Sequence, residues 1–184
     1  MAEPRRTIEL DDPRALRALA HPIRLRLVGL LRREGPLTAT QAGERIGESP
    51  ASCSFHLRQL AKWGLVEEAG GGRGRERPWQ ATAEFTHWKV QSPEQAEAAA
   101  AFSGTVSRGY GEQLLDWFER MPAEEPAWQE RHHLGDTTLS LGPEEADELG
   151  RKIWELARSY ERPARAGDRR VTFIYALFPQ RVDR

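Results

Sequence analysis

Proline and glycine divide residues 12–64 into a series of short helical segments, and this punctuation constrains the fold more than any other feature. Proline is tolerated in the first turn of a helix but not in its interior, and glycine commonly follows a helix's last turn. The dividing residues are Pro13, Pro22, Gly35, Gly47, Pro50 and Gly64. The pattern predicts helices over residues 13–20, 22–34, 39–46 and 50–63.

The third and fourth of these helices are joined by only "GES", which predicts a helix-turn-helix. Two short apolar stretches follow, "LVEEAG" and "PWQATA", around the segment "GGGRGRER". Such a pattern is typical of a β-hairpin with a glycine-rich, arginine-loaded tip. An arginine-glycine segment also occurs in RNA-binding proteins, but its place between two predicted strands favours a wing beside the helix-turn-helix.

The helix predicted over residues 50–63 has one apolar face and one unusual polar face. Cys53, Leu57 and Leu60 recur at helical spacing and should pack inward. On the other side we expect Ser52, Phe55, His56 and Gln59. Hydroxyl, amide, imidazole and aromatic groups suit base edges in the DNA major groove, which is about as wide as a helix. This helix is therefore the candidate recognition helix.

Other polar and basic residues surround the candidate recognition helix. The free N–H groups at its start favour a phosphate, and Lys62 can neutralise backbone charge near its end. The wing adds arginines that can reach a neighbouring groove. The full set of predicted DNA-binding residues is Thr38, Thr40, Ser49, Ser52, Ser54, Phe55, His56, Arg58, Gln59, Arg73, Arg75 and Arg77.

Residues 12–82 resemble the winged helix-turn-helix of ArsR-type bacterial transcriptional regulators. The resemblance rests on "LRALAHPIRLRLVGLL", "LTATQAGERIG" and "SPASCSFHLRQLAKWGLVEE", in that order, followed by the glycine-arginine wing. It implies that Ser54, Phe55, His56 and Arg58 touch DNA. It also implies a homodimer on an inverted-repeat operator.

Two departures from that family indicate that the chain is not a metal sensor. Residues 39–46 contain none of the paired cysteines of metal-sensing members, and residues 92–120 contain no histidine. We expect Cys53, the single cysteine, to be an inert core thiol. His132 and His133 are adjacent, so on a strand they would point to opposite faces and could not readily share a metal. The sequence predicts no cofactor and no metal.

The second half of the chain begins with a capping box, "SPEQ", and a helix predicted over residues 92–120. Its length of about 42 Å exceeds what a small winged-helix core can cover, so a second copy is the expected partner. Packing against the chain's own C-terminal half is the alternative. The predicted dimer residues, spaced three or four apart, are Phe102, Val106, Tyr110, Leu114, Trp117 and Met121.

Residues 130–178 predict a strand, an amphipathic helix and a largely buried strand over "RVTFIYALF". The expected fold class is α+β, mainly helical, with a winged helix-turn-helix over residues 12–82 and a dimerisation half over residues 92–184. The formal charge changes between these halves. Residues 1–82 hold 14 Lys/Arg and 10 Asp/Glu, a balance of +4, whereas the rest holds 13 and 18, a balance of −5. The basic half is the one expected to meet DNA.

These features favour a sequence-specific regulator that binds double-stranded DNA, with a small-molecule effector as a further partner. The alternative is a winged-helix protein-interaction module. No arrangement of nucleophile and base stands out, and the glycine-rich tip lacks the lysine of a phosphate-binding loop. We therefore expect no enzyme.

No apolar run reaches the length of a membrane span and the N-terminus has no apolar signal core, which predicts a cytoplasmic protein without a membrane partner. Trp117, Trp128 and Trp154 are expected in the core, in the dimer interface or in a ligand pocket.

Overall fold

The computed structural model describes residues 6–70 and 77–180. It divides into two compact units, Met1–Glu119 and Arg120–Arg184. The long helix therefore groups with the winged helix, whereas the sequence had suggested a boundary between residues 82 and 92. Each unit is described separately below.

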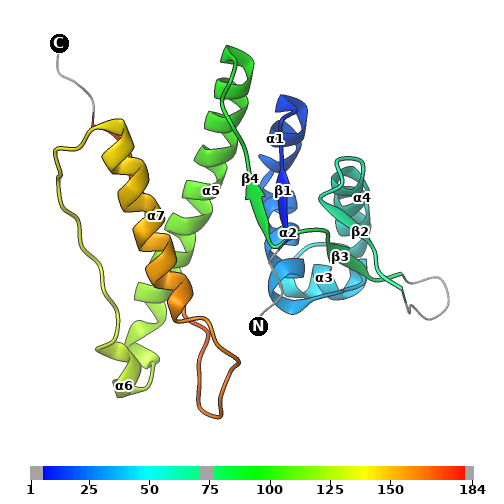
Figure 1. Ribbon diagram of the computed structural model, residues 1–184. Helices are drawn as coiled ribbons and strands as arrows, with labels where there is room; N and C mark the ends of the chain where they lie inside the picture. The colour runs from blue at the N-terminus through cyan, green and yellow to red at the C-terminus, as the bar shows by residue number, and fades with distance from the viewer. Residues whose placement is uncertain (1–5, 71–76, 181–184) are drawn as a thin grey trace. The chain divides into compact units, whose positions relative to one another are not determined.

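The predicted series of helices is confirmed in the first unit. The four helices are α1 (Pro13–Leu19), α2 (Pro22–Glu34), α3 (Ala39–Ile46) and α4 (Pro50–Ala61). Three of the four starts have the expected side-chain cap: Asp12, Thr38 and Ser49 accept hydrogen bonds from backbone N–H groups of α1, α3 and α4. These caps satisfy donors that would otherwise lack a partner at the helix start. Figure 1 shows α3 and α4 next to the small sheet formed by β2 and β3.

The predicted hairpin is also confirmed. Strand β2 (Val66–Glu68) pairs antiparallel with β3 (Trp79–Ala81), with Glu68 opposite Trp79. Leu37, just before α3, forms a further bridge to Trp79, with N–O distances of 3.0 and 2.8 Å. The wing is thereby tied to the start of α3 by backbone hydrogen bonds.

A second small sheet was not predicted. Strand β1 (Thr7–Glu9) lies parallel to β4 (Phe85–His87), so the chain before α1 pairs with the chain after the wing. The Arg32 guanidinium of α2 supports this pairing by donating to the Ala83 carbonyl and to the Thr86 hydroxyl, at 2.9 and 2.7 Å. A parallel pair of three-residue strands has too little sequence pattern to be read in advance.

The core lies among α1, α2, α3, α4 and the first half of α5 (Pro93–Arg120). Leu16, Leu27, Leu57 and Leu60 are fully buried there. Helix α5 contributes Ala98, Ala99 and Phe102 to the same cluster. Thr105 fixes the helix further, because its hydroxyl donates to the Ala20 carbonyl at 3.0 Å.

The second unit contains the short helices η1 (Met121–Ala123) and α6 (Pro126–Gln129) and the longer α7 (Pro143–Ser159). The predicted central helix is therefore confirmed. The two predicted strands over residues 131–141 and 170–178 are wrong in this structure: neither segment is a strand, and residues 170–178 are exposed instead of buried. A strand requires a neighbour for its backbone groups, and neither segment has one among the described residues.

The fold class is α+β and mainly helical, as the sequence predicts, with an N-terminal helix-turn-helix and a long helix after the wing. Within residues 6–70 and 77–180, no helix combines the length and the apolar character that crossing a membrane requires.

Candidate nucleic-acid interface

The angle between α3 and α4 depends on a glycine in α3. A Cβ added to Gly43 would lie 2.5 Å from the Glu48 carbonyl oxygen, closer than real Cβ contacts. The Gly43 carbonyl in turn accepts the Glu48 N–H at 3.0 Å. Gly47 completes the turn at φ +68°, in the left-handed region that glycine adopts at little cost. Close approach of the turn after α3 is thus the reason for a glycine at position 43.

The outer side of α4 carries much of the predicted DNA-binding set. Cys53, Leu57 and Leu60 are fully buried, which confirms the predicted inward stripe. Phe55 is half exposed and Arg58 is exposed. Ser52, Ser54 and Gln59 are partly exposed. At the helix start the Ser49 hydroxyl accepts the Ser52 N–H at 3.1 Å, so this serine already caps one of the free donors.

His56 does not lie on this outer face, and the predicted exposure of its side chain is wrong. It is only 8% exposed. Its ring lies 4.5 Å from the ring of His21, and its Nδ1 accepts a hydrogen bond from Arg24 Nε at 3.4 Å. On a helix, position 56 lies at the border between the buried face, positions 53, 57 and 60, and the exposed face, which includes position 55. The contact with His21 places the His56 ring on the buried side of this border. His56 therefore anchors α4 to the junction between α1 and α2.

Burial lowers the pKa of both His21 and His56, and the neighbouring Arg24 lowers both further; the pKa of His56 is also lowered by His21. Both rings are thus held in the neutral form. Arg24 is a residue that the sequence pattern missed, although its position three residues after His21 places it one turn along α2. Its Nη1 donates to the Ala18 carbonyl at 2.8 Å.

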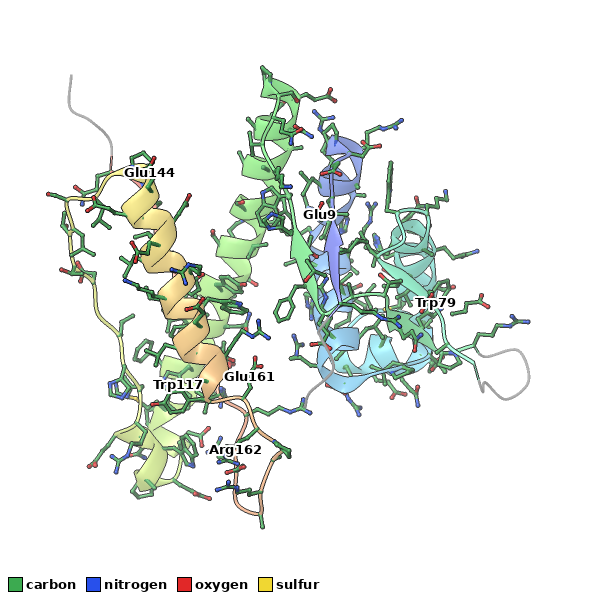
Figure 2. The ribbon with its side chains drawn as sticks, viewed as in Figure 1. Glu9, Trp79, Trp117, Glu144, Glu161 and Arg162 are labelled. Carbon is green, nitrogen blue, oxygen red and sulfur yellow. The ribbon has the colours of Figure 1, made fainter. Side chains whose placement is uncertain are left out.

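A hollow of about 390 Å³ lies among α3, α4 and the wing. It is lined by five of the predicted DNA-binding residues, namely Thr38, Thr40, Ser54, Arg58 and Arg77. Glu68 and Trp79 of the wing strands complete it, and Figure 2 labels Trp79 on its strand. The hollow thus brings three hydroxyl groups and two guanidinium groups together, which are donors that suit phosphate oxygens.

Glu68 gives this hollow an internal counter-charge. Arg77 Nη1 lies 3.0 Å from Glu68 Oε2, in a pair whose two side chains are 71% and 47% exposed. Sequence reasoning missed Glu68, because strand alternation shows that Glu67 and Glu68 point to opposite faces but not which of them faces α4. Arg73 and Arg75, predicted at the wing tip, lie outside the described residues.

The predicted dimer residues on α5 fall into two groups. Phe102 is 5% exposed, packs edge to face on Trp88 at 4.9 Å, and belongs to the chain's own core. Val106 packs against the same core. These two residues are therefore internal, because the first half of α5 covers α1 and α2. Tyr110 and Leu114, further along, are 42% and 38% exposed. Trp117 is partly buried, and Met121 lies beyond α5 in the second unit.

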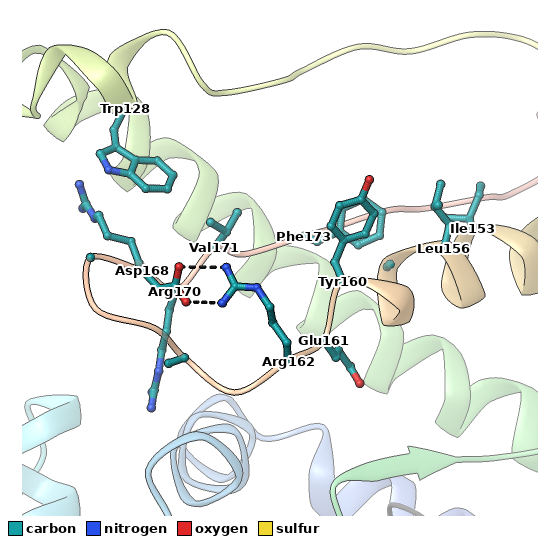
Figure 3. A pocket seen from close by; sticks show the side chains of 14 residues that line it. Trp128, Ile153, Leu156, Tyr160, Glu161, Arg162, Asp168, Arg170, Val171 and Phe173 are labelled. Atoms are coloured by element: carbon teal, nitrogen blue, oxygen red, sulfur yellow. Dashed lines mark hydrogen bonds and ion pairs between the residues drawn. The ribbon is translucent and has the colours of Figure 1, made fainter. Parts of the chain in front are cut away.

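The second unit contains a larger hollow of about 920 Å³ (Figure 3). One wall is apolar: Ile153 and Leu156 of α7, with Tyr160 just after the helix, face Val171 and Phe173. At one end, Arg162 pairs with both oxygens of Asp168 at 2.6 and 3.0 Å. The Arg162 guanidinium lowers the pKa of Asp168 to about 2, so this pair is charged at neutral pH.

A second arginine that lines this hollow also forms an ion pair with a carboxylate. Arg169 lies 2.8 Å from Glu124, and its guanidinium stacks over the Trp128 ring at 5.2 Å. The hydrogen bond from Arg169 lowers the pKa of Glu124. Two of the three arginines that line the hollow are therefore matched by carboxylates, whereas Arg170 and the apolar wall have no such partner among the described residues.

The remaining candidate groups do not form a site within the described residues. No group of three or more His, Cys, Asp or Glu side chains there is placed to hold a metal ion. His132 Nδ1 contacts the Gln129 carbonyl at 2.9 Å, and His133 is exposed. Cys53 is fully buried, and burial raises the pKa of its thiol, which is the inert condition expected from the sequence.

Comparison with known proteins bears directly on the helix-turn-helix. Residues 19–69 match the family model described as "Helix-turn-helix domain". The matched stretch runs from the end of α1 to β2 and contains both helices of the candidate interface. It supports a DNA-binding transcriptional regulator in the broad sense. No curated protein matches.

Several solved structures are loosely similar. ZitR of Lactococcus lactis, as the apo C30AH42A mutant, is 13% identical, with 77% of this chain and 84% of that chain covered and a TM-score of 0.34. The PcaV transcriptional regulator of Streptomyces coelicolor, in complex with its natural ligand, is 14% identical, covering 75% and 74%, with a TM-score of 0.32. RV1404 of Mycobacterium tuberculosis is 16% identical, covering 82% and 86%, with a TM-score of 0.32. At these scores the likeness supports no conclusion about the chain.

Proposed function

We propose that the chain is a sequence-specific, ArsR-like regulator that binds an inverted-repeat operator on double-stranded DNA as a homodimer. The observation that carries the proposal is the hollow among α3, α4 and the wing, where three hydroxyl groups and two arginines converge beside the exposed face of a helix. A fold alone does not establish a function. Two of these donors also have structural contacts, because Thr38 caps α3 and Arg77 pairs with Glu68.

In the proposed docking, the hollow holds a backbone phosphate and α4 enters the major groove. Thr38, Thr40 and Ser54 donate hydroxyl hydrogens to the phosphate oxygens, and Arg58 supplies charge. The Thr38 hydroxyl already accepts the Gln41 N–H at 3.2 Å, which leaves its hydrogen available. Phosphate contacts fix the position of the helix, whereas base contacts read the sequence.

Base readout then falls to the exposed residues of α4. Phe55 projects a planar apolar ring, which suits the methyl group of thymine. Ser52 and Gln59 provide hydrogen-bonding groups on the same side. His56 has no direct part in this reading, because it is buried against His21.

The proposed dimer is formed through the second half of α5. Tyr110 and Leu114, four residues apart on one face of the helix, are exposed apolar residues there. A two-fold dimer places two recognition helices on half-sites about one helical turn, roughly 34 Å, apart.

The proposal is tested by equilibrium binding of the purified full-length chain to a labelled duplex and to the matching single strand, over a series of salt concentrations. Groove docking predicts tighter binding to the duplex and a log-log salt slope that grows with the number of phosphate contacts. A chain that binds neither at low salt would be a protein-interaction module, the alternative that the sequence left open.

A second candidate function is regulation by a small apolar effector, which the 920 Å³ hollow of the second unit favours. Its volume lies within the range of ligand pockets, about 300–1,000 Å³. Because Arg162 and Arg169 are paired with carboxylates and one wall is apolar, a mainly apolar ligand fits, and Arg170 is the lining cation that can meet a polar group on it. A screen of apolar metabolites by shift in thermal midpoint tests this function. Leu156→Lys, which places a charge in the apolar wall, should abolish any shift that the parent chain shows.

A further inference from the structure

The described part of the second unit, residues 120–180, has no core of buried residues. None of the described residues from 121 to 180 is buried. Its exposed large apolar residues are Leu134, Leu139, Leu141, Trp154, Leu156, Tyr160, Val171, Phe173, Ile174, Tyr175, Leu177 and Phe178. Monomeric proteins rarely leave so large an apolar set open to water. These apolar residues therefore need a partner that covers them permanently. Such a partner has to be present whenever the chain is made.

Residues 170–178 contain half of this exposed set in one extended segment. The sequence, "RVTFIYALF", is rich in β-branched and aromatic residues and has no charge after Arg170, as strands do. Its odd-numbered side chains share one face: Phe173 stacks on Tyr175 at 5.9 Å, and Tyr175 lies 6.5 Å from Trp154 of α7. One face of the segment thus already lies against a helix.

The backbone edges of this segment, by contrast, have no partner. Within the described chain, no backbone hydrogen bond joins residues 170–178 to another segment. Unpaired N–H and C=O groups along an apolar extended segment form an open strand edge, which pairs with any matching strand. The other extended segment, residues 131–141, is linked to this region only by a side-chain hydrogen bond of 3.4 Å from Gln180 to Thr138.

We infer that residues 170–178 pair antiparallel with the same residues of a second copy of this chain. A two-fold axis through the middle of a strand makes two identical strands antiparallel, and a second copy is the one partner produced together with every chain. Self-pairing also brings no like charges opposite each other. The segment's single charge, on Arg170, then lies opposite Phe178 and not opposite another cation.

The register follows from the residues at the two ends. Pairing centred on Ile174 places Val171 opposite Leu177 and Phe173 opposite Tyr175, so apolar residues meet apolar residues on the face that lies against α7. It also leaves Pro179, which has no N–H to donate, outside the ladder. This interface is distinct from the one proposed on α5 and does not depend on DNA binding.

Cysteine cross-linking of the full-length chain tests both the partner and the register. In the inferred register the two copies of residue 174 are directly opposite, at a separation compatible with a disulfide. Ile174→Cys should therefore form a covalent dimer under mild oxidation at low protein concentration. The parent chain, whose only cysteine is buried at position 53, should not.

Val171→Cys is the matched control within the same strand. Its two copies would lie about 20 Å apart, so this variant alone should not cross-link, whereas a mixture of Val171→Cys and Leu177→Cys should. Efficient self-linkage of Val171→Cys, or none of Ile174→Cys, would overturn the inferred pairing.

Hydrogen exchange of the unsubstituted chain tests the pairing without any substitution that could alter folding. Paired backbone amides in residues 170–178 should exchange slowly at high protein concentration and lose this protection on dilution. Protection that does not change with concentration would mean that the chain's own residues 131–141 cover the strand, and rapid exchange at every concentration would mean that nothing does. Either result contradicts the inference.

Discussion

The rings of His21 and His56 lie with their centroids 4.5 Å apart, and this contact ties α4 to the junction between α1 and α2. Arg24 donates to His56 from α2 and adds a positive charge to the same place. Glu48 is the carboxylate that opposes these effects on both histidines. The position of α4 therefore depends on two rings that remain uncharged.

Acidification should destabilise the winged helix through this pair. Both pKa values are lowered in the folded chain from the ordinary value of 6.5, so the unfolded chain binds these protons first. Stability should be constant above about pH 7 and fall as the pH drops below about 6.5. Thermal unfolding measured from about pH 7 down to about pH 5.5 checks this, because this interval lies above the pKa values of most carboxylates. His56→Gln should flatten the dependence, whereas the same change at the exposed His133 should leave it unaltered.

Gly43→Ala should destabilise the first unit, because the new methyl group would meet the Glu48 carbonyl at 2.5 Å. We expect a loss of about 1–3 kcal/mol, typical of overpacking, despite the higher helix propensity of alanine. Gly104→Ala in α5 is the matched control. Its Cβ would meet only the end of the Arg108 side chain, at 3.8 Å, and should stabilise by about 0.5–1 kcal/mol. Chemical unfolding measures both, and equal effects would contradict the proposed role of Gly43.

If the hollow among α3, α4 and the wing holds a backbone phosphate, as proposed, then removing two neighbouring charges should have opposite effects on DNA affinity. Arg58→Ala should weaken binding to all DNA sequences and reduce the salt slope by about one. Glu68→Gln should strengthen binding at low salt, because it removes a carboxylate from the hollow and releases Arg77. Glu67→Gln is the control, since Glu67 bonds to Gln80 and does not line the hollow. Titrations by fluorescence anisotropy would refute the phosphate site if Glu67→Gln and Glu68→Gln behaved alike.

Phe55→Ala should relax sequence preference with little effect on stability. The ring is 50% exposed, so little apolar area is buried by folding at this position. Loss of a base contact costs about 1–3 kcal/mol of discrimination at one base pair. Competition between a preferred duplex and single-base variants measures this, with Lys62→Ala expected to weaken all duplexes equally. Unchanged discrimination would remove Phe55 from the reading face.

Dimerisation through α5 predicts that Leu114→Glu dissociates the helix pair, because Leu114 continues the stripe begun by Tyr110. Leu115→Glu introduces the same charge one position away and should have a smaller effect. Sedimentation of both variants should be measured together with cross-linking at position 174, since pairing of residues 170–178 can keep two chains associated. Backbone hydrogen exchange of residues 107–119 should become faster in Leu114→Glu. Unchanged protection of these residues would contradict dimerisation through α5.

The sequence was most informative where single residues determine the backbone. Pro13, Pro22 and Pro50 each begin a helix, and Ser49 caps α4, because these preferences act within one turn. It was less informative where a side chain lies between two faces. His56 is adjacent to both the buried and the exposed side of α4, and only the position of His21 determines its direction.

Long-range pairing was beyond the sequence pattern. The residues of β1 and β4 lie far apart in the chain, and nothing in "TIE" or "FTH" indicates their match. In residues 170–178 the pattern does indicate a strand, but the chain offers it no partner. The first half of α5 illustrates the same difficulty, because its spacing fits either a second copy or the chain's own core, and Phe102 proves to be in the core.

The most direct test of the central claim is selection of bound sequences from a random duplex pool by the purified full-length chain at moderate salt. Docking of two α4 helices as a dimer predicts enrichment of an inverted repeat whose half-sites are centred about one helical turn apart, and loss of this enrichment in Phe55→Ala. Retention of DNA without enrichment would contradict it, because the hollow would then hold phosphates while α4 reads no sequence.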